Sequence, residues 1–372
     1  MKNKETLILF LILIALILIS GGILGYKIYT KNIASNETAN LNQEQSNADE
    51  DNNENEPIVV APPKQIEIFN GEERPIAVML DNHTGAWPHV ALNQAYLVYE
   101  IIVEGAETRL MALFKGKDLS RIGSVRSSRH YFLDYALEND AIYVHFGWSP
   151  QAESDIKTLG VNNINGITES SSNFWRTKQK SSPHNVETST ESILKIAERK
   201  GYETTSSKES VLNYTADEIN LENGTNATEV IIPHSSSQKV KYEYNPEIGK
   251  YTRYARNKLQ TDGATGEDII TKNIIITFCD NYTLQDSENK GRQGLYNIGT
   301  FKGYYITNGK AIEIRCIKNS RTQQTVYKDL EGNEINVNDG NTFIHIVPQS
   351  AKVEIVGNEN ENLSTGTEII DN

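Results

Sequence analysis

The sequence predicts a protein that mixes α and β structure: an N-terminal membrane helix and flexible stalk, an α/β layered first domain, and a mainly antiparallel β second domain. Three observations predict it: one long uncharged apolar segment, a first half in which strand-like runs alternate with capped helical segments, and a second half in which apolar residues alternate. The expected order is a transmembrane anchor at 1–31, a disordered acidic stalk at 32–64, an α/β domain at 65–205, a linker at 206–237, a β-rich domain at 238–357 and a flexible tail at 358–372.

The apolar segment "TLILFLILIALILISGGILGY" runs from Thr6 to Tyr26 without a charge. About twenty apolar residues are needed to cross the hydrocarbon core of a bilayer. Lys2 and Lys4 precede the segment and favour a cytoplasmic N-terminus. We therefore expect a single-pass protein of the cell membrane whose bulk is extracytoplasmic. The sequence leaves open whether the anchor is retained or cleaved as a secretory signal.

The charge of the chain excludes one class of partner. The 372 residues carry a formal net charge of −13, which argues against general nucleic-acid binding because phosphate neutralisation needs a surplus of Lys and Arg. Much of this acidity lies between Asn32 and Pro57, a stretch without Lys or Arg and almost without aromatic residues. Such a composition cannot bury enough surface to fold, so it predicts a stalk.

The first domain shows strand and helix signals in alternation. Ser149 is typical of a helix N-cap, Pro150 of the first helical position and Gly160 of a helix stop. The expected strands are 74–80, 96–103, 109–115 and 141–147, and the expected helices are 127–139, 149–160 and 189–201.

The second domain shows a period of two with turn signals between the runs. Hairpins are expected within 241–257, within 304–314 around Asn308-Gly309, and within 326–347. Cys279 and Cys316 both end strand-like runs. A disulfide is permitted outside the cytoplasm, but the sequence leaves open whether these two cysteines pair or stay as buried free thiols.

The candidate binding residues lie at strand ends and at one helix start. The predicted helix at 127–139 would place Arg126, Arg129 and His130 on one face near its N-terminus, where the helix dipole disfavours cations. They need a negative partner, either an internal carboxylate such as Glu100, Glu104 or Glu107, or an external anion. The full candidate set is Arg109, Arg126, Ser127, Arg129, His145, His184, Asn82, His83, Glu100 and Glu104.

Glu100 and Glu104 also raise the question of a paired-carboxylate hydrolase. On a helix their side chains would start about 5 to 6 Å apart, as in retaining glycosidases, whereas on a strand they would be about 13 Å apart. The β-branched and aromatic content favours the strand. A metal site built from His83, His145 and His184 with Asp81 or Asp134 lacks the tight spacing of metal motifs, so we expect neither a metal nor a cofactor.

Several stretches in order resemble the YerB family of extracytoplasmic bacterial lipoproteins, which consist of paired domains of unknown function. The first-half stretches are "RPIAVMLDNH", "YLVYEIIVEGAETRLMALF", "IGSVRSSRHYFLD", "AIYVHFGWSPQA", "NNINGI" and "SPHN"; the second-half stretches are "YTRYARNKLQTDGATGEDIITKNIII", "KGYYITNGKAIEI" and "DGNTFIHIVP". The resemblance implies a membrane-tethered envelope protein and no established reaction. The anchor here departs from the family by lacking a lipidated cysteine, and Cys316 stands where the family tends to carry tryptophan.

Together these features predict a tethered cell-envelope protein that binds an anionic or sugar-containing wall component through an Arg/His pocket in the first domain. Two alternatives remain open: an envelope hydrolase or transferase acting on peptidoglycan or wall polymer, and a structural partner of wall-synthesis machinery. The expected partners are the membrane, a cell-wall polymer or envelope proteins, and no nucleic acid. The sequence leaves open whether the protein is an enzyme.

Overall fold

The computed structural model describes residues 64–68, 71–357 and 362–364. The predicted anchor, almost all of the stalk and most of the tail lie outside these residues. All of the described residues fall in one compact unit that begins at Pro63. Within this part of the chain, no helix combines the length and apolarity that crossing a membrane requires.

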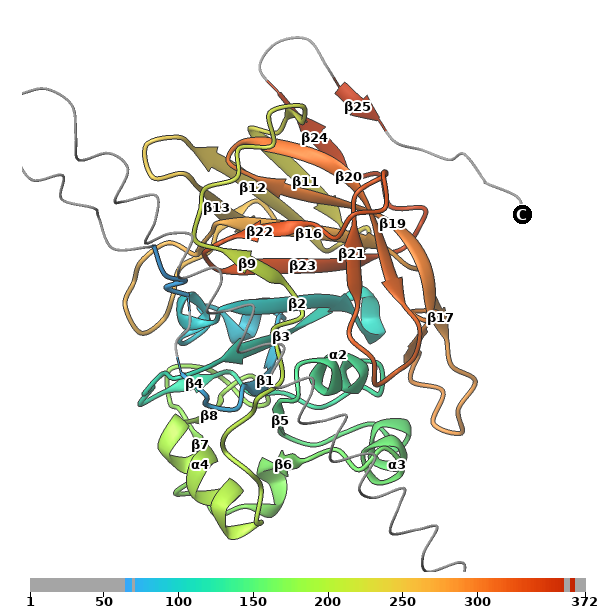
Figure 1. Ribbon diagram of the computed structural model, residues 1–372. Helices are drawn as coiled ribbons and strands as arrows, with labels where there is room; N and C mark the ends of the chain where they lie inside the picture. The colour runs from blue at the N-terminus through green and yellow to red at the C-terminus, as the bar shows by residue number, and fades with distance from the viewer. Residues whose placement is uncertain (1–63, 69–70, 358–361, 365–372) are drawn as a thin grey trace, which may run out of the picture. The chain divides into compact units, whose positions relative to one another are not determined.

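The core of the molecule is one eleven-stranded sheet to which both halves of the chain contribute (Figure 1). Strand β2 from the first half lies beside and parallel to β23 from the second half. The strand order is β10 (Thr225–Asn226), β20 (Lys310–Lys318), β19 (Gly299–Thr307), β16 (Asn273–Phe278), β23 (Thr342–Val347), β2 (Leu97–Ile102), β3 (Thr108–Phe114), β1 (Ile76–Asp81), β5 (Ile142–His145) and β6 (Asn163–Asn165), with β21 (Val326–Lys328) paired to β20.

Burial explains why β16 and β23 lie in the middle of the sheet. Every residue of both strands is buried, as expected of strands covered on two faces. β23 runs parallel to both of its neighbours, β2 and β16. The second half is mainly β as predicted, and two of the three predicted hairpins form, β19 with β20 and β12 (Lys239–Asn245) with β13 (Lys250–Ala255). The hairpin of paired strands expected within 326–347 is wrong: β21 pairs with β20, β22 (Asn336–Asn338) with β9 (Asn213–Thr215), and β23 with β16 and β2, because long-range strand pairing outweighs the local turn signal.

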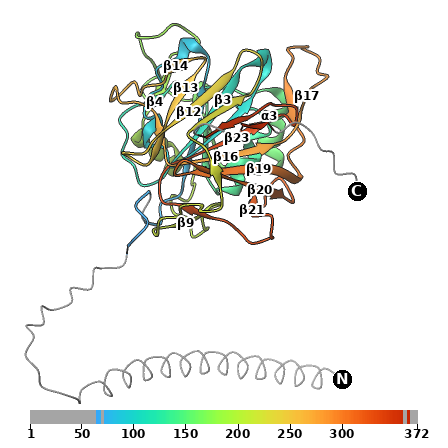
Figure 2. The same cartoon turned by 90° about the horizontal axis from the view of Figure 1, so that it is seen from above.

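A second sheet of seven strands packs on the first, and Figure 2 shows it from above. Its central strands alternate buried and half-buried residues, which is typical of a sheet with one face on the core. Its strands are β14 (Lys258–Leu259), β13 (Lys250–Ala255), β12 (Lys239–Asn245), β11 (Glu229–Pro233), β24 (Glu354–Val356) and β25 (Asn362–Ser364), with β15 (Ile270–Thr271) on β13.

The segment 206–237, expected as a linker, is built into these sheets. It contains β10 and β11, and also β9 (Asn213–Thr215), which pairs with β22 (Asn336–Asn338). Smaller strands complete the β structure: β17 (Asn281–Thr283) with β18 (Gln293–Leu295), and β4 (Ile122–Gly123) with β8 (Val186–Thr188) and β7 (Trp175–Arg176). The segment that connects the two halves is therefore itself made partly of paired strands.

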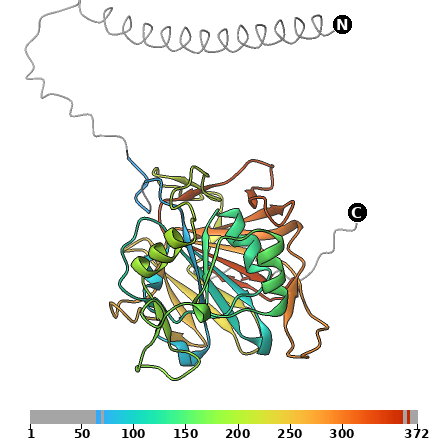
Figure 3. The ribbon, with the colours of Figure 1, turned by 90° about the horizontal axis from the view of Figure 1, so that it is seen from below.

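Three α-helices occur in the described residues: α2 (Phe132–Glu138), α3 (Pro150–Thr158) and α4 (Thr190–Arg199), which are visible from below in Figure 3. Ser149 and Ser189 cap α3 and α4 as their positions predict. Successive side chains of β1 point to opposite faces of the large sheet, and different helices cover the two faces. Val78 and Leu80 share a core with α4, and Ala77 and Met79 share another with α2 and α3.

The first half departs from a regular α/β alternation. β1, β5 and β6 are parallel, but β2 and β3 run antiparallel to their neighbours within it. The helices are short and few beside the strands. The described residues thus form a mainly β structure with α elements confined to the first half.

The helix expected at 127–139 begins later, at Phe132. The backbone N–H of Arg126 donates to the carbonyl of Met79, and Ser128 bridges Trp148 in strand fashion. These long-range backbone bonds hold the chain extended, so Arg126 and Arg129 precede the helix instead of sharing one of its faces.

Both cysteines are free and buried. Cys316 lies on β20, and Cys279 directly follows β16; β19 separates these two strands. Two strand spacings amount to about 9.5 Å, beyond the reach of a disulfide. Of the two alternatives, the structure has the buried free thiols.

Candidate functional site

The carboxyl ends of β1 and β5 are separated by an inserted segment of backbone. The two strands pair in parallel as far as Val78 and Val144, after which Leu80 bridges Val125 instead. The N–H of Phe146 donates to the carbonyl of Arg126 on the other side of this insertion. Ligand sites of open α/β sheets lie at the carboxyl ends of strands where neighbouring strands diverge.

Three arginines and two carboxylates meet at this edge, and we call Arg109, Arg126, Arg129, Asp81 and Glu104 the arginine cluster. Arg129 donates to both carboxylate oxygens of Glu104, with the Nε bond at 2.9 Å. Arg109 Nη2 lies 3.7 Å from the same carboxylate. Arg126 Nε lies 3.2 Å from Asp81 Oδ2. Three guanidinium groups thus share two internal acids.

The cluster concentrates positive charge where water is scarce. Burial lowers the pKa of Arg109 to about 10, and the charge of Arg129 adds to this shift. Burial raises the pKa of Glu104, but the hydrogen bond and charge of Arg129 outweigh burial and bring that pKa to about 2. Glu104 therefore stays ionised, and the three arginines outnumber the two acids of the cluster.

Two histidines adjoin Asp81. His184 Nδ1 lies 2.7 Å from Asp81 Oδ2, the same oxygen that faces Arg126. The ring of His83 stacks on that of His184 with centroids 4.4 Å apart. His83 Nδ1 accepts a hydrogen bond from the N–H of Gly85 at 3.0 Å, which orients its ring. A carboxylate-oriented imidazole of this kind can hold or move a proton at its other nitrogen.

Two other predicted site residues, Ser127 and His145, form hydrogen bonds mainly to backbone groups. The hydroxyl of Ser127 donates to the carbonyl of Phe146, and the Ser127 carbonyl accepts from Arg109. His145 is fully buried and contacts the Gly147 carbonyl at 2.8 Å and Asn163 at 3.2 Å. Burial lowers the pKa of His145 to about 4, so it stays neutral. Its role is to fix the loop after β5.

Glu100 and Glu104 have different partners. Glu100 lies on β2, as the strand prediction requires, and Glu104 lies in the 3-10 turn Glu104–Ala106 after that strand. Glu104 belongs to the arginine cluster, whereas Glu100 hydrogen-bonds to Arg253. The two carboxylates therefore do not form a catalytic pair. Glu107, another proposed internal partner, pairs with Arg256.

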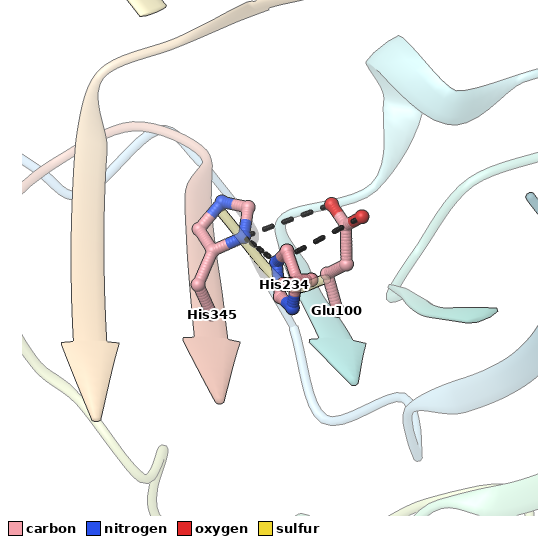
Figure 4. Close-up of side chains that lie close together, drawn as sticks. All are labelled: Glu100, His234 and His345. Atoms are coloured by element: carbon pink, nitrogen blue, oxygen red, sulfur yellow. Dashed lines mark hydrogen bonds and ion pairs between the residues drawn. The ribbon is translucent and has the colours of Figure 1, made fainter. Parts of the chain in front are cut away.

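A second cluster is enclosed between the two sheets and consists of Glu100, His234, His345 and Arg253. Figure 4 shows the first three of these side chains close together. Glu100 on β2 and His345 on β23 are register partners, and His234 follows β11. His234 Nε2 lies 3.0 Å from His345 Nδ1. The Glu100 carboxylate lies 3.9 Å from His234 and 3.6 Å from His345. Sequence reasoning had passed over both histidines.

These spacings resemble those of a metal site, because ligand atoms on one tetrahedral zinc lie about 3.3 Å apart. The carboxylate is already occupied, however. The Glu100 carboxylate accepts hydrogen bonds from Arg253 at 2.8 Å, from Thr108 at 2.8 Å and from Asn82 at 3.1 Å. Arg253 is fully buried and balances the Glu100 charge, so an added dication would be an uncompensated buried charge. The residues fit a buried ion pair better than a metal.

The metal donors considered in the sequence are only partly brought together. His83 and His184 meet at Asp81, whereas His145 faces Asn163. Asp134 accepts from Arg321 at 2.7 Å and from Asn297 at 3.0 Å. The structure also has a groove of about 970 Å³ at the other end of β1, lined by residues such as Arg74, Phe114 and Lys195 and by no member of the candidate set.

Comparison with known proteins assigns most of the described residues to two family regions. Residues 64–203 match the model described as "Protein of unknown function (DUF3048) N-terminal domain", and residues 230–344 match the corresponding C-terminal domain. A Bacillus subtilis (strain 168) protein named "Putative lipoprotein YerB" is 31% identical over 285 residues, which cover 74% of this chain and 82% of the relative.

The crystal structure of YerB protein from Bacillus subtilis is similar in fold. The TM-score is 0.67 at 30% sequence identity, and the match covers 76% of this chain and 94% of that chain. The order of the two matched regions is the order that the resemblance to YerB predicted. The chain therefore belongs to the DUF3048 family of YerB-like proteins, with paired N-terminal and C-terminal domains of unknown function.

Proposed function

We propose that the protein is a membrane-tethered, extracytoplasmic protein of the cell envelope that binds an anionic group of a wall component at the arginine cluster. The tether is supported by the uncharged segment from Thr6 to Tyr26 and by the name of the Bacillus subtilis relative, which calls that protein a lipoprotein. An extracytoplasmic position gives the arginine cluster access to wall polymers, many of which carry phosphate or carboxylate groups.

One observation carries the binding proposal: three guanidinium groups face two carboxylates at the strand ends. An incoming anion would compensate the excess positive charge without displacing an internal pair. Arg126 is the residue positioned to meet it, because its side chain is 26% exposed whereas those of Arg109 and Arg129 are 8% and 7% exposed.

The test is calorimetric titration of the full chain with inorganic phosphate, with a glycerol-phosphate polymer and with muropeptides. We expect Arg126→Gln to weaken binding about 10-fold or more, since a hydrogen bond to a charged group contributes about 1.5–3 kcal/mol. Arg199→Gln is the matched control, because Arg199 is an exposed arginine on α4 paired with Glu169. Equal affinities for both variants, or no binding to the unmodified chain, would contradict the proposal.

A second candidate function is an envelope hydrolase or transferase, and the Asp81–His184 hydrogen bond specifically favours it. In this reading Arg126 binds the anionic substrate, and His184 transfers a proton at its outer nitrogen. Incubation with the same wall fragments distinguishes the two functions. New products that disappear in His184→Gln would support catalysis, whereas binding without products supports a binding protein.

A further inference from the structure

Lys272, Asn308 and Glu218 form a closed set of contacts far from the arginine cluster in the sequence. Lys272 Nζ lies 2.6 Å from Asn308 Oδ1 and 2.6 Å from Glu218 Oε1. Asn308 Nδ2 donates to the same Glu218 oxygen at 2.6 Å. An amine, a carboxamide and a carboxylate therefore each contact the other two.

The surrounding backbone holds Lys272 and Asn308 in place. Lys272 directly precedes β16, and its side chain is only 10% exposed. Gly340 makes room for the lysine, because a Cβ there would lie 2.5 Å from Lys272 Cβ. Asn308 occupies the left-handed region with φ of 51° in the turn between β19 and β20. Its amide nitrogen also donates to the Ile219 carbonyl at 3.0 Å.

We propose that Lys272 and Asn308 are joined by an intramolecular amide bond formed by the chain itself. The neutral Nζ of Lys272 attacks Cγ of Asn308, the new Nζ–Cγ bond forms, and the Cγ–Nδ2 bond breaks. Ammonia leaves, so one amide replaces another and no oxidant, reductant or external reactant is consumed. Groups held in contact by the fold react with the large rate advantage of an intramolecular reaction.

Glu218 supplies the proton transfers that this step needs. Its carboxylate touches both the attacking amine and the leaving amide nitrogen, so it can accept a proton from the first and return it to the second. Burial acts to raise the pKa of Glu218, but the hydrogen bonds from Lys272 and Asn308 prevail and lower it. The carboxylate is thus ionised and lies against both nitrogens between which the proton must move.

The proposed bond would lock the end of a strand pair. Asn273 and Thr307 are register partners of β16 and β19, and the bond would join the residues immediately beyond them. It would close a loop between positions 36 residues apart, which restricts the unfolded chain. The two cysteines are free, so a lysine–asparagine bond would give this region a covalent closure that no disulfide provides.

The test is the intact mass of the full chain, followed by peptide mapping. We expect a mass lower than the sequence mass by one ammonia, about 17 Da, and a linked peptide pair containing Lys272 and Asn308. Lys272→Arg keeps a cation beside Glu218 but removes the nucleophilic amine, so it should show the full mass. Glu218→Gln should slow or abolish the loss. Lys241→Arg, whose amine lies between Glu229 and Glu243, is the control and should retain it.

Two results would overturn the inference. One is the full sequence mass after prolonged incubation of the folded chain. The other is a loss of ammonia that persists in Lys272→Arg without a linked peptide pair, which would indicate a succinimide at Asn308-Gly309. Neither result bears on anion binding, so this inference and the proposed function can fail separately.

Discussion

At Glu100, a carboxylate lies on a strand whose other positions are almost all buried. Removing this charge from water is unfavourable unless donors replace the water, and Arg253, Thr108 and Asn82 do so. The polar residue within the apolar run "YLVYEIIV" was a signal that a buried partner was needed, but nothing local identified Arg253, which lies 153 residues later.

Replacing one partner of this ion pair should destabilise the folded protein more than replacing both partners. We expect Arg253→Met to lower the free energy of unfolding by about 3–5 kcal/mol, because it leaves the Glu100 charge buried and unpaired. The double variant Glu100→Gln with Arg253→Met should recover part of that loss. Urea denaturation of both variants and of the unmodified chain checks this, with exposed Arg199→Met as the control. A stability for Arg253→Met equal to that of the control would refute it.

The arginine cluster shows the same principle at the carboxyl ends of the strands. Local sequence indicated that Arg126 and Arg129 need an anionic partner, and the structure identifies Asp81 and Glu104 as the internal ones. Glu104 was among the expected internal partners, whereas Asp81 was considered only as a possible metal donor and not as a partner of the arginines. Which carboxylate faces which guanidinium depends on how the segment before α2 threads between β1 and β5.

Helices with explicit end signals were predicted well. Ser149 is the N-cap of α3, where its hydroxyl accepts from the N–H of Ala152 at 3.2 Å, and Gly160 follows the helix in the left-handed region. The start of α2 was predicted wrongly because its upstream segment carries no comparable cap and is held by β1 and β5 instead. Local sequence signals determine where a helix begins only when no long-range backbone hydrogen bond competes with them.

The cap of α3 offers a direct check. Ser149→Ala should lower the free energy of unfolding by about 1 kcal/mol, because the N–H of Ala152 loses its acceptor. Ser149→Asp supplies another acceptor and should remain close to the unmodified chain. Thermal unfolding followed by circular dichroism measures both. Equal losses for the two variants would show that the hydroxyl does more than cap the helix.

In the whole molecule, the two family regions are not separate bodies but share one sheet across the β2–β23 junction. The Glu100–Arg253 pair lies at that junction and contributes one residue from each region. Sequence periodicity predicted the strands of each half. It could not predict the junction, because two fully buried strands present similar apolar surfaces to many partners.

Buried neutral histidines make the folded molecule sensitive to acid. Burial lowers the pKa of His145 to about 4, and burial and the Arg253 charge lower that of His89 to about 4. An unfolded histidine has a pKa of about 6.5, so between about pH 6.5 and 4 the unfolded chain binds more protons than the folded one. The free energy of unfolding should therefore decrease as the pH falls through this range.

Urea denaturation midpoints at pH 7.5, 6 and 5 measure this effect. The midpoint should fall with each step, and His145→Gln should reduce the slope because it removes one of the titrating groups. A midpoint that stays constant or rises on acidification would contradict the expectation. Below about pH 4.5 the loss should continue, because the lowered pKa of Glu104 makes its protonation destabilising in the same direction.

The sequence alone determined most of the main strands, two of the three expected hairpins, the capped helices and the family, because each depends on local periodicity, end signals or ordered motifs. The membrane segment stays a prediction, since it lies outside the described residues. Only the tertiary structure decided that β2 and β23 join the halves, that Arg253 neutralises Glu100, and that Asp81 and Glu104 hold the three arginines. The physical reason is that burial and charge pairing act between groups distant in the chain, and a residue's own neighbours do not specify which distant group it will meet.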